Sequence, residues 1–134
     1  MKLYRTFSLT MLLVFAAVGI LFLAIPSGVL GFFNSLSAGF GLSPAPTPVG
    51  YFYLGLAVAY MTLVSALAFL MFRHPTNHYF PVLLAVGKLS SSVLSLAMFL
   101  FAQRSLILVA NFVVDGAIGT AAVLFAAGIR RANR

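Results

Sequence analysis

Residues 105–129 read SLILVANFVVDGAIGTAAVLFAAGI, and Arg130 and Arg131 follow directly. Asp115 is the only charged side chain in this run. A helix needs about 20 mainly apolar residues to cross the ~30 Å hydrocarbon core of a bilayer, so the run is long enough to span it. Paired arginines at the end of such a run are typical of a cytoplasmic boundary. The stretch therefore predicts a transmembrane helix with an acid near its middle.

Three more apolar runs precede this one and have clear ends. The first stops at Pro26, the second stops at Arg73, and the third starts after Pro81. The first run is longer than the ~7–15 residue core of a signal peptide, so we interpret it as a spanning helix as well. The sequence predicts an all-α integral membrane protein with one domain over residues 1–134. We expect an antiparallel four-helix bundle with spans at about 6–25, 50–72, 81–101 and 105–129.

The composition supports the same class. Of the 134 residues, 63% are hydrophobic and 7% are charged, whereas a soluble domain has about 45–50% apolar and about 25% charged residues. So few polar side chains cannot cover a water-soluble globule, which excludes a cytoplasmic enzyme domain. The absence of cysteine excludes disulfides, iron–sulfur clusters, thiolate zinc sites and catalytic thiols.

The net charge of +7 is distributed in a way that predicts topology rather than nucleic-acid binding. The basic residues stand at the ends of apolar runs instead of gathering on one face, so we expect no nucleic-acid partner. With both termini in the cytoplasm, the one basic loop residue outside is Arg104, and the inner side carries Lys2, Arg5, Arg73, Arg130, Arg131 and Arg134. This bias predicts an N-in, C-in multi-pass protein of the bacterial inner (plasma) membrane.

The long outer connection at residues 26–49 carries no charge and is rich in proline and glycine. Apolar residues recur in it at helical spacing, namely Val29, Phe32, Phe33, Leu36 and Phe40. One interpretation is a short helix in the outer membrane interface, with Asn34 and Ser37 turned toward water. The other is an irregular apolar loop packed on the mouth of the bundle. Residues 43–48, which include several prolines, are expected to be extended.

Small residues recur in register on the later spans. The second span has Gly55, Ala59, Thr62 and Ala66, the third has Gly87, Ser91 and Ser95, and the fourth has Asn111, Asp115, Gly119, Ala122 and Ala126. In lipid, where no hydrophobic force drives helices together, such rows let two helices approach closely. We expect each row to lie at a contact between helices of the bundle.

Asp115 is the only acidic residue of the chain, and Lys88 is the only basic residue inside a span. An acid at the centre of a spanning helix costs about 2.5–3.5 kcal/mol, so it should face a partner or water. Measured along the helices, Lys88 lies ~10 Å and Asp115 ~20 Å from the inner end. We predict a buried polar layer, reached by Lys88 from the inner side, that comprises Asp115, Asn111, Tyr60, Ser92 and Ser95.

Three hypotheses fit this layer. It is a structural clasp, in which an ion pair sets the register of the helices. Alternatively it is a proton or ligand site, because ionisable residues inside a membrane often mark such sites. In the third hypothesis, Lys88 extends to the cytoplasmic headgroups instead of pairing. A proton path normally needs several titratable groups, so a single carboxylate favours the clasp.

The sequence gives only weak signals for a metal, haem or catalytic site. His74 and His78 have the i, i+4 spacing of metal ligands on a helix, but Pro75 disfavours a regular helix there. No histidine lies at mid-membrane depth to bind haem, and the serines lack the central histidine and second acid of a hydrolase triad. We therefore predict no catalytic, cofactor-binding or metal-binding residues, no cofactor and no enzyme activity.

The Gly-rich segment Gly28-Val29-Leu30-Gly31-Phe32-Phe33-Asn34, Lys88 and the pair Asp115-Gly116 resemble small four-helix bacterial membrane proteins of the DoxX-like kind. The resemblance covers most of the chain in layout. It implies association with quinone-linked respiratory enzymes as a small membrane subunit, and it transfers no active site. The chain differs from small multidrug exporters, which need an acid in the first helix, and it lacks the Gly-Arg and Thr-rich signatures of fluoride channels.

These features together predict a non-catalytic accessory subunit of a larger inner-membrane complex, with the lipid bilayer and other membrane subunits as partners. We expect an energy-transducing host complex, either quinone-linked respiratory or photosynthetic. No residue pattern indicates contact with a quinone or a pigment, and such contacts stay open. One alternative function is a small oligomeric transporter or channel that uses Asp115 and Lys88. A further alternative is a quinone- or lipid-binding membrane protein.

Overall fold

A computed structural model describes residues 2–46 and 50–132, and in these residues every regular element is an α-helix. The helices are α1 (Lys2–Ala24), α2 (Pro26–Gly39), α3 (Tyr51–Arg73), α4 (Tyr79–Phe101) and α5 (Leu106–Ala132). All but α2 are long and apolar enough to cross a membrane. The prediction of an all-helical protein with four such helices is confirmed.

Each of the four long helices extends beyond its predicted span at one end, and α4 and α5 show why the sequence allows this. Helix α4 begins at Tyr79, ahead of Pro81. Proline is tolerated in this first turn because the N–H groups there have no intrahelical partner. Helix α5 continues past residue 129, so Arg130 and Arg131 lie in its last turn. Cations are favourable at this end, which carries the negative pole of the helix dipole.

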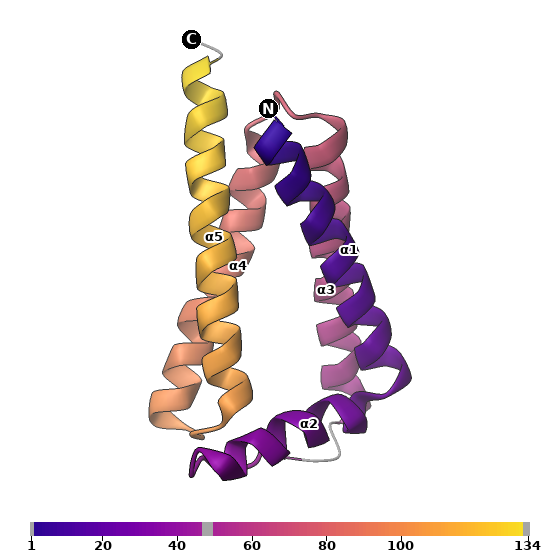
Figure 1. Cartoon of the computed structure of the whole chain (residues 1–134), viewed down its shortest axis with the longest axis vertical. Helices are drawn as coiled ribbons and strands as arrows, with labels where there is room; N and C mark the ends of the chain where they lie inside the picture. The colour runs from indigo at the N-terminus through magenta and orange to yellow at the C-terminus, as the bar shows by residue number, and fades with distance from the viewer. Residues whose placement is uncertain (1, 47–49, 133–134) are drawn as a thin grey trace.

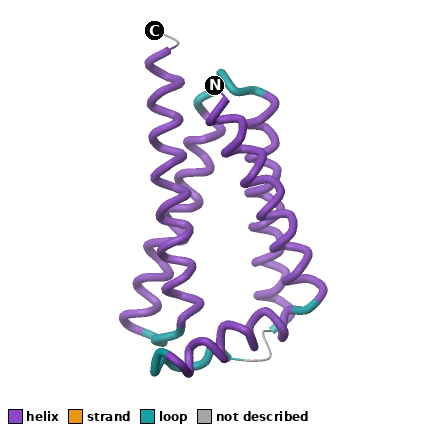
Figure 2. Tube along the Cα trace, viewed as in Figure 1, coloured by secondary structure: helices purple, strands orange, loops and turns teal. Residues whose placement is uncertain are grey.

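The long helices form two pairs, α1 with α3 and α4 with α5 (Figure 1). Packing within each pair is more extensive than packing between α3 and α4. Successive long helices run in alternating directions, which leaves both termini and the α3–α4 turn at one end of the molecule (Figure 1). At the other end α2 lies across both pairs, as the trace in Figure 2 shows. We call these the terminal end and the α2 end.

Large apolar side chains cover the outside of the long helices. One on each helix illustrates this, since more than half of the side chain is exposed at Leu13, Leu63, Val93 and Leu124. Soluble proteins rarely expose apolar surface on this scale, whereas the hydrocarbon core of a bilayer accommodates it. The exterior is therefore compatible with a multi-pass membrane protein.

Helices α4 and α5 approach closely because the residues between them are small. The buried face of α5 contains Asp115, Gly119, Ala122 and Ala126. A Cβ atom built on Gly119 would lie 2.7 Å from Leu89 Cγ, and one built on Gly116 would lie 2.9 Å from Ser92 Oγ. The small-residue row predicted on α5 therefore lies at a helix–helix contact, as expected.

The row predicted on α3 faces outward instead. Its members are all exposed, namely Gly55, Ala59, Thr62 and Ala66. A different side of α3 is buried, with Val64, Ala68 and Met71. The expectation that this row lies at a contact within the chain is therefore wrong. The reason is that α1 supplies the small residue at the α1–α3 contact, where a Cβ built on Gly19 would lie 3.4 Å from Met61 Cβ.

The outer connection contains the helix α2, so of the two interpretations the helix is correct and the irregular loop is wrong for residues 26–39. Phe32 and Phe40 point outward and are 61% and 71% exposed. The expectation that Asn34 and Ser37 face water is wrong. Ser37 is buried, and Asn34 exchanges two hydrogen bonds with the backbone of Ala45, Nδ2 to O at 3.0 Å and N to Oδ1 at 2.7 Å. The amide side chain thereby pairs backbone groups that the proline-rich segment cannot pair within itself.

The segment after α2 ties this helix to the turn between α4 and α5. Residues 43–46 are not helical, and the rest of the stretch expected to be extended, residues 47 and 48, lies outside the described residues. Ser43 N donates to Arg104 O at 2.8 Å, and Gln103 Nε2 donates to Pro44 O. Leu106 N, at the start of α5, donates to Ser37 Oγ at 3.3 Å. Helix α2 is therefore fastened to the α4–α5 pair as well as to α1.

Gly119→Ala should destabilise the protein by about 1–3 kcal/mol, because the added methyl group overpacks against Leu89 and separates α5 from α4. Gly55→Ala is the matched control, since nothing lies within 4 Å of a Cβ at that position. Alanine there should be neutral or stabilising by up to ~1 kcal/mol. Thermal unfolding in mild detergent, followed by circular dichroism, measures both changes. Equal effects would contradict the close α4–α5 contact.

Candidate functional site

Lys88 of α4 and Asp115 of α5 form an ion pair in the interior of the four long helices. Lys88 Nζ lies 2.8 Å from Asp115 Oδ1, and the two side chains are only 1% and 3% exposed. The hypothesis that Lys88 extends to the headgroups is wrong, because its ammonium is buried and bonded to the carboxylate. The lysine stem bridges the difference in depth that the sequence predicts between the two residues.

The Lys88 ammonium also faces two aromatic rings of the other helix pair. Its Nζ lies 3.7 Å from the ring centroid of Phe15 in α1 and 5.0 Å from that of Tyr60 in α3. An ammonium has three N–H donors and no acceptor. The carboxylate takes one of them, and the negative faces of the two rings attract the remaining positive charge. One cation thus contacts a side chain from each of the other three long helices.

Hydrogen bonds between α4 and α5 continue the polar layer toward the α2 end. Asn111 Nδ2 donates to Ser95 Oγ at 2.7 Å and to Ser91 Oγ at 3.0 Å. Ser92 Oγ donates to the carbonyl of Phe112 at 2.7 Å. Because these bonds join the same two helices as the ion pair, they fix the register of α4 against α5.

Two polar atoms of the layer are buried without a hydrogen bond of regular geometry to the described residues: Tyr60 Oη and Asp115 Oδ2. Tyr60 faces the site with its ring, which the Lys88 ammonium approaches. Asp115 holds Lys88 through a single oxygen. The predicted residues of the layer lie together, but Tyr60 has a different part in it from the polar one expected.

Sequence reasoning missed two members of the site, Phe15 and Ser91. The chain has 14 phenylalanines, and no spacing distinguishes Phe15 from those that face outward. Ser91 belongs to the predicted small-residue row but not to the predicted polar layer. The signal for it is its position one turn before Ser95, because side chains four residues apart share a helix face and can accept from one amide.

The arrangement is suited to hold helices together rather than to bind and release a ligand. Two buried charges are tolerated only when they are paired with good geometry, as Lys88 and Asp115 are. Among the described residues, no group of three His, Cys, Asp or Glu side chains could hold a metal ion. His74 caps the end of α3 and His78 the start of α4, so they lie on opposite sides of a turn.

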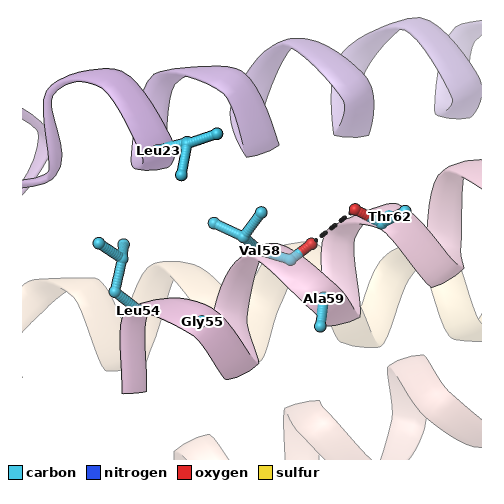
Figure 3. A pocket seen from close by; sticks show the side chains of 6 residues that line it. All are labelled: Leu23, Leu54, Gly55, Val58, Ala59 and Thr62. Atoms are coloured by element: carbon cyan, nitrogen blue, oxygen red, sulfur yellow. Dashed lines mark hydrogen bonds between the residues drawn. The ribbon is translucent and has the colours of Figure 1, made fainter. Parts of the chain in front are cut away.

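An apolar groove lies on the outward face of α3 beside α1 (Figure 3). Its volume is about 570 Å³, and it is lined by Leu23 of α1 and by Leu54, Gly55, Val58, Ala59 and Thr62 of α3. The Thr62 hydroxyl donates to the Val58 carbonyl at 2.9 Å, the bond dashed in Figure 3, so it is satisfied within its own helix. Neither Lys88 nor Asp115 lines this groove. The groove includes most of the outward small-residue row of α3.

Comparison with known proteins gave no match, since no family model, no curated protein and no solved structure is similar to the chain. The resemblance to DoxX-like proteins therefore stays a prediction. Function has to be inferred from the ion pair, the outer surface and the distribution of charge.

Lys88→Met should destabilise the protein by about 3–5 kcal/mol, because it strands the Asp115 carboxylate in an apolar interior. Adding Asp115→Leu should recover most of the loss, since two apolar side chains then face each other. Lys2→Met, at an exposed position, is the control and should change stability by less than ~0.5 kcal/mol. Unfolding in mild detergent gives the three values. A double variant as unstable as Lys88→Met would show that stranded charge is not the cause.

Phe15→Leu should cost about 1–2 kcal/mol beyond its lost apolar area, because it removes the ring nearest the Lys88 cation. Tyr60→Phe should be neutral or stabilising, because it keeps a ring and removes a buried hydroxyl that makes no hydrogen bond of regular geometry to the described residues. Phe69→Leu, at a half-exposed position on α3, controls for the loss of a ring elsewhere. The same unfolding assay applies. If Tyr60→Phe were as costly as Phe15→Leu, the hydroxyl rather than the ring would be the stabilising group.

Proposed function

We propose that the chain is a multi-pass protein of the bacterial inner membrane and a non-catalytic accessory subunit of a larger membrane complex. Its four long helices would cross the bilayer as an antiparallel bundle with both termini in the cytoplasm. The charge distribution supports this orientation. Lys2, Arg5, Arg73, Arg130 and Arg131 belong to the terminal end, and Arg104 belongs to the α2 end. An excess of Lys and Arg is the usual mark of the cytoplasmic side.

The observation that carries the subunit proposal is the outward small-residue row of α3. It extends from Gly55 to Ala66, which is ~16 Å along the helix axis or about half of the hydrocarbon core. Exposed small residues also occur on α5, such as Ala117, but there the large exposed side chains of Val113 and Leu124 stand on the same helix face. Small residues give no advantage against lipid chains, but they let another helix approach the backbone closely. We infer that a transmembrane helix of another subunit lies along this row.

Charge favours a different subunit over a second copy of the chain. The chain has eight basic residues and one acid, and that acid already pairs with Lys88. A second copy packed alongside would bring two strongly basic terminal ends together, which is repulsive. A larger subunit with acidic residues at the cytoplasmic surface would be attracted instead. The DoxX-like resemblance favours an energy-transducing complex, quinone-linked respiratory or photosynthetic, as the host.

The geometry favours the subunit over a small transporter or channel that uses Asp115 and Lys88. Transport through this pair would require Asp115 to exchange a proton or an ion with water. Its side chain is 3% exposed and held by Lys88, and neither residue of the pair lines the α3 groove. A structural clasp needs no such access.

Photo-crosslinking in native membranes tests the proposal. A photoreactive residue at Thr62 should give one adduct with a protein larger than the 14.3 kDa chain, and one at the lipid-facing Leu124 should give none. Ala59→Leu, which fills the groove, should abolish the adduct and release the chain from a complex of fixed stoichiometry in native mass spectrometry. Ala117→Leu, at an exposed position of α5, should do neither.

Two outcomes would contradict the subunit proposal. An adduct of twice the chain's own mass would favour a homo-oligomer, and with it the transporter or channel. The absence of any adduct at Thr62, with the complex unaffected by Ala59→Leu, would show that the small-residue row binds no partner.

A further inference from the structure

A second groove lies between α4 and α5 near the terminal end, on a part of the surface that the proposed subunit contact does not use. Its volume is about 400 Å³. Its walls are apolar and include Val82, Val86 and Leu89 from α4 and Val123 and Ala127 from α5. Two polar side chains, His78 and Arg130, also line it. They stand at its terminal end, because α4 begins just after His78 and α5 ends just after Arg130.

The dimensions of the groove match part of a lipid chain. From Val82 to Leu89 it follows α4 for ~10 Å, about two thirds of the ~15 Å that one leaflet contributes to the hydrocarbon core. Ala126 and Ala127 line the α5 side, and their small side chains leave the space open. An extended acyl chain would therefore lie between the two helices with its polar end toward His78 and Arg130.

The charge at the mouth of the groove has no acidic side chain of its own protein to pair with. Asp115 is the only acidic side chain, and it is buried against Lys88, so Arg130 can form no salt bridge with a side chain of its own protein. A guanidinium presents a fork of N–H donors that fits two phosphate oxygens at once. The N-terminal end of α4, which carries the positive pole of its dipole, opens at the same place.

We propose that this groove binds one anionic phospholipid, with an acyl chain between α4 and α5 and the phosphate at Arg130 and His78. Basic pockets between helices on the cytoplasmic side commonly bind anionic headgroups. The site goes beyond the proposed subunit function, since it needs no partner protein. It would neutralise part of the surplus charge of the terminal end and seal the α4–α5 contact against neighbouring lipids.

Native mass spectrometry of the full chain in mild detergent tests the site, with phosphatidylglycerol and phosphatidylcholine of the same acyl chains as probes. We expect one phosphatidylglycerol to bind about tenfold more tightly than phosphatidylcholine. Arg130→Gln should remove most of this preference. Arg131→Gln makes the same charge change one position along α5, away from the groove, and should change the affinity by less than about twofold.

A second pair of variants tests the apolar part of the groove. Ala127→Leu fills it and should weaken the binding of both lipids, whereas Ala117→Leu, on the outward side of α5, should not. Circular dichroism checks that all variants remain helical.

Four results would overturn the lipid site. Equal losses from Arg130→Gln and Arg131→Gln would mean diffuse attraction by the basic end, and equal binding of the two lipids would mean that no headgroup is recognised. Displacement of phosphatidylglycerol by millimolar inorganic phosphate would indicate a free-anion site. If Ala127→Leu released a protein partner and left the lipid count unchanged, the groove would be a protein interface.

Discussion

The Lys88 ammonium is the point at which all four long helices meet. It bonds Asp115 of α5 at 2.8 Å and faces the rings of Phe15 in α1 and Tyr60 in α3. Because Asp115 is the only acid in the chain, Lys88 has no other anionic partner. A slip of α4 against α5 by one turn, ~5.4 Å, would separate the two charges inside an apolar interior. The pair therefore selects one register, and the rings hold the α1–α3 pair where its direct contact with α4 is limited.

The features that depend on local sequence could be predicted. The features that depend on which residue of another helix lies opposite could not. The four long helices follow from the length and hydropathy of each apolar run, and the α4–α5 contact from small residues in register. The outward turn of the α3 row depends on Gly19, which supplies the small residue at the α1–α3 contact. The role of Phe15 could not be predicted, because only its position beside Lys88 in the folded chain distinguishes it from the other phenylalanines. The sequence predicts Ser37 and Asn34 to be surface residues, because the backbone groups that they bond come from Leu106 and Ala45, which are distant in sequence.

The chain has one acidic residue and eight basic ones, which affects both its interior and its surface. One buried pair uses the only acidic side chain, so no other basic residue can pair with an acidic side chain of the chain. The other basic residues stand mainly at the terminal end, beside a groove suited to a lipid, while a separate row of small residues on α3 is open to another helix. The ion pair thus belongs to the interior, whereas both grooves are open on the outer surface.

The most direct measurement is the distance between Lys88 Nζ and Asp115 Cγ in a lipid bilayer. The chain has Lys2 and Lys88 as its only lysines and Asp115 as its only aspartate, so ¹⁵N-lysine and ¹³C-aspartate labels, with Lys2→Arg, report on this one pair. Solid-state NMR should show a strong ¹⁵N–¹³C dipolar coupling, as required by a nitrogen 2.8 Å from a carboxylate oxygen. A coupling too weak for direct contact would mean that Lys88 does not pair with Asp115 in the membrane and that another interaction holds the helices.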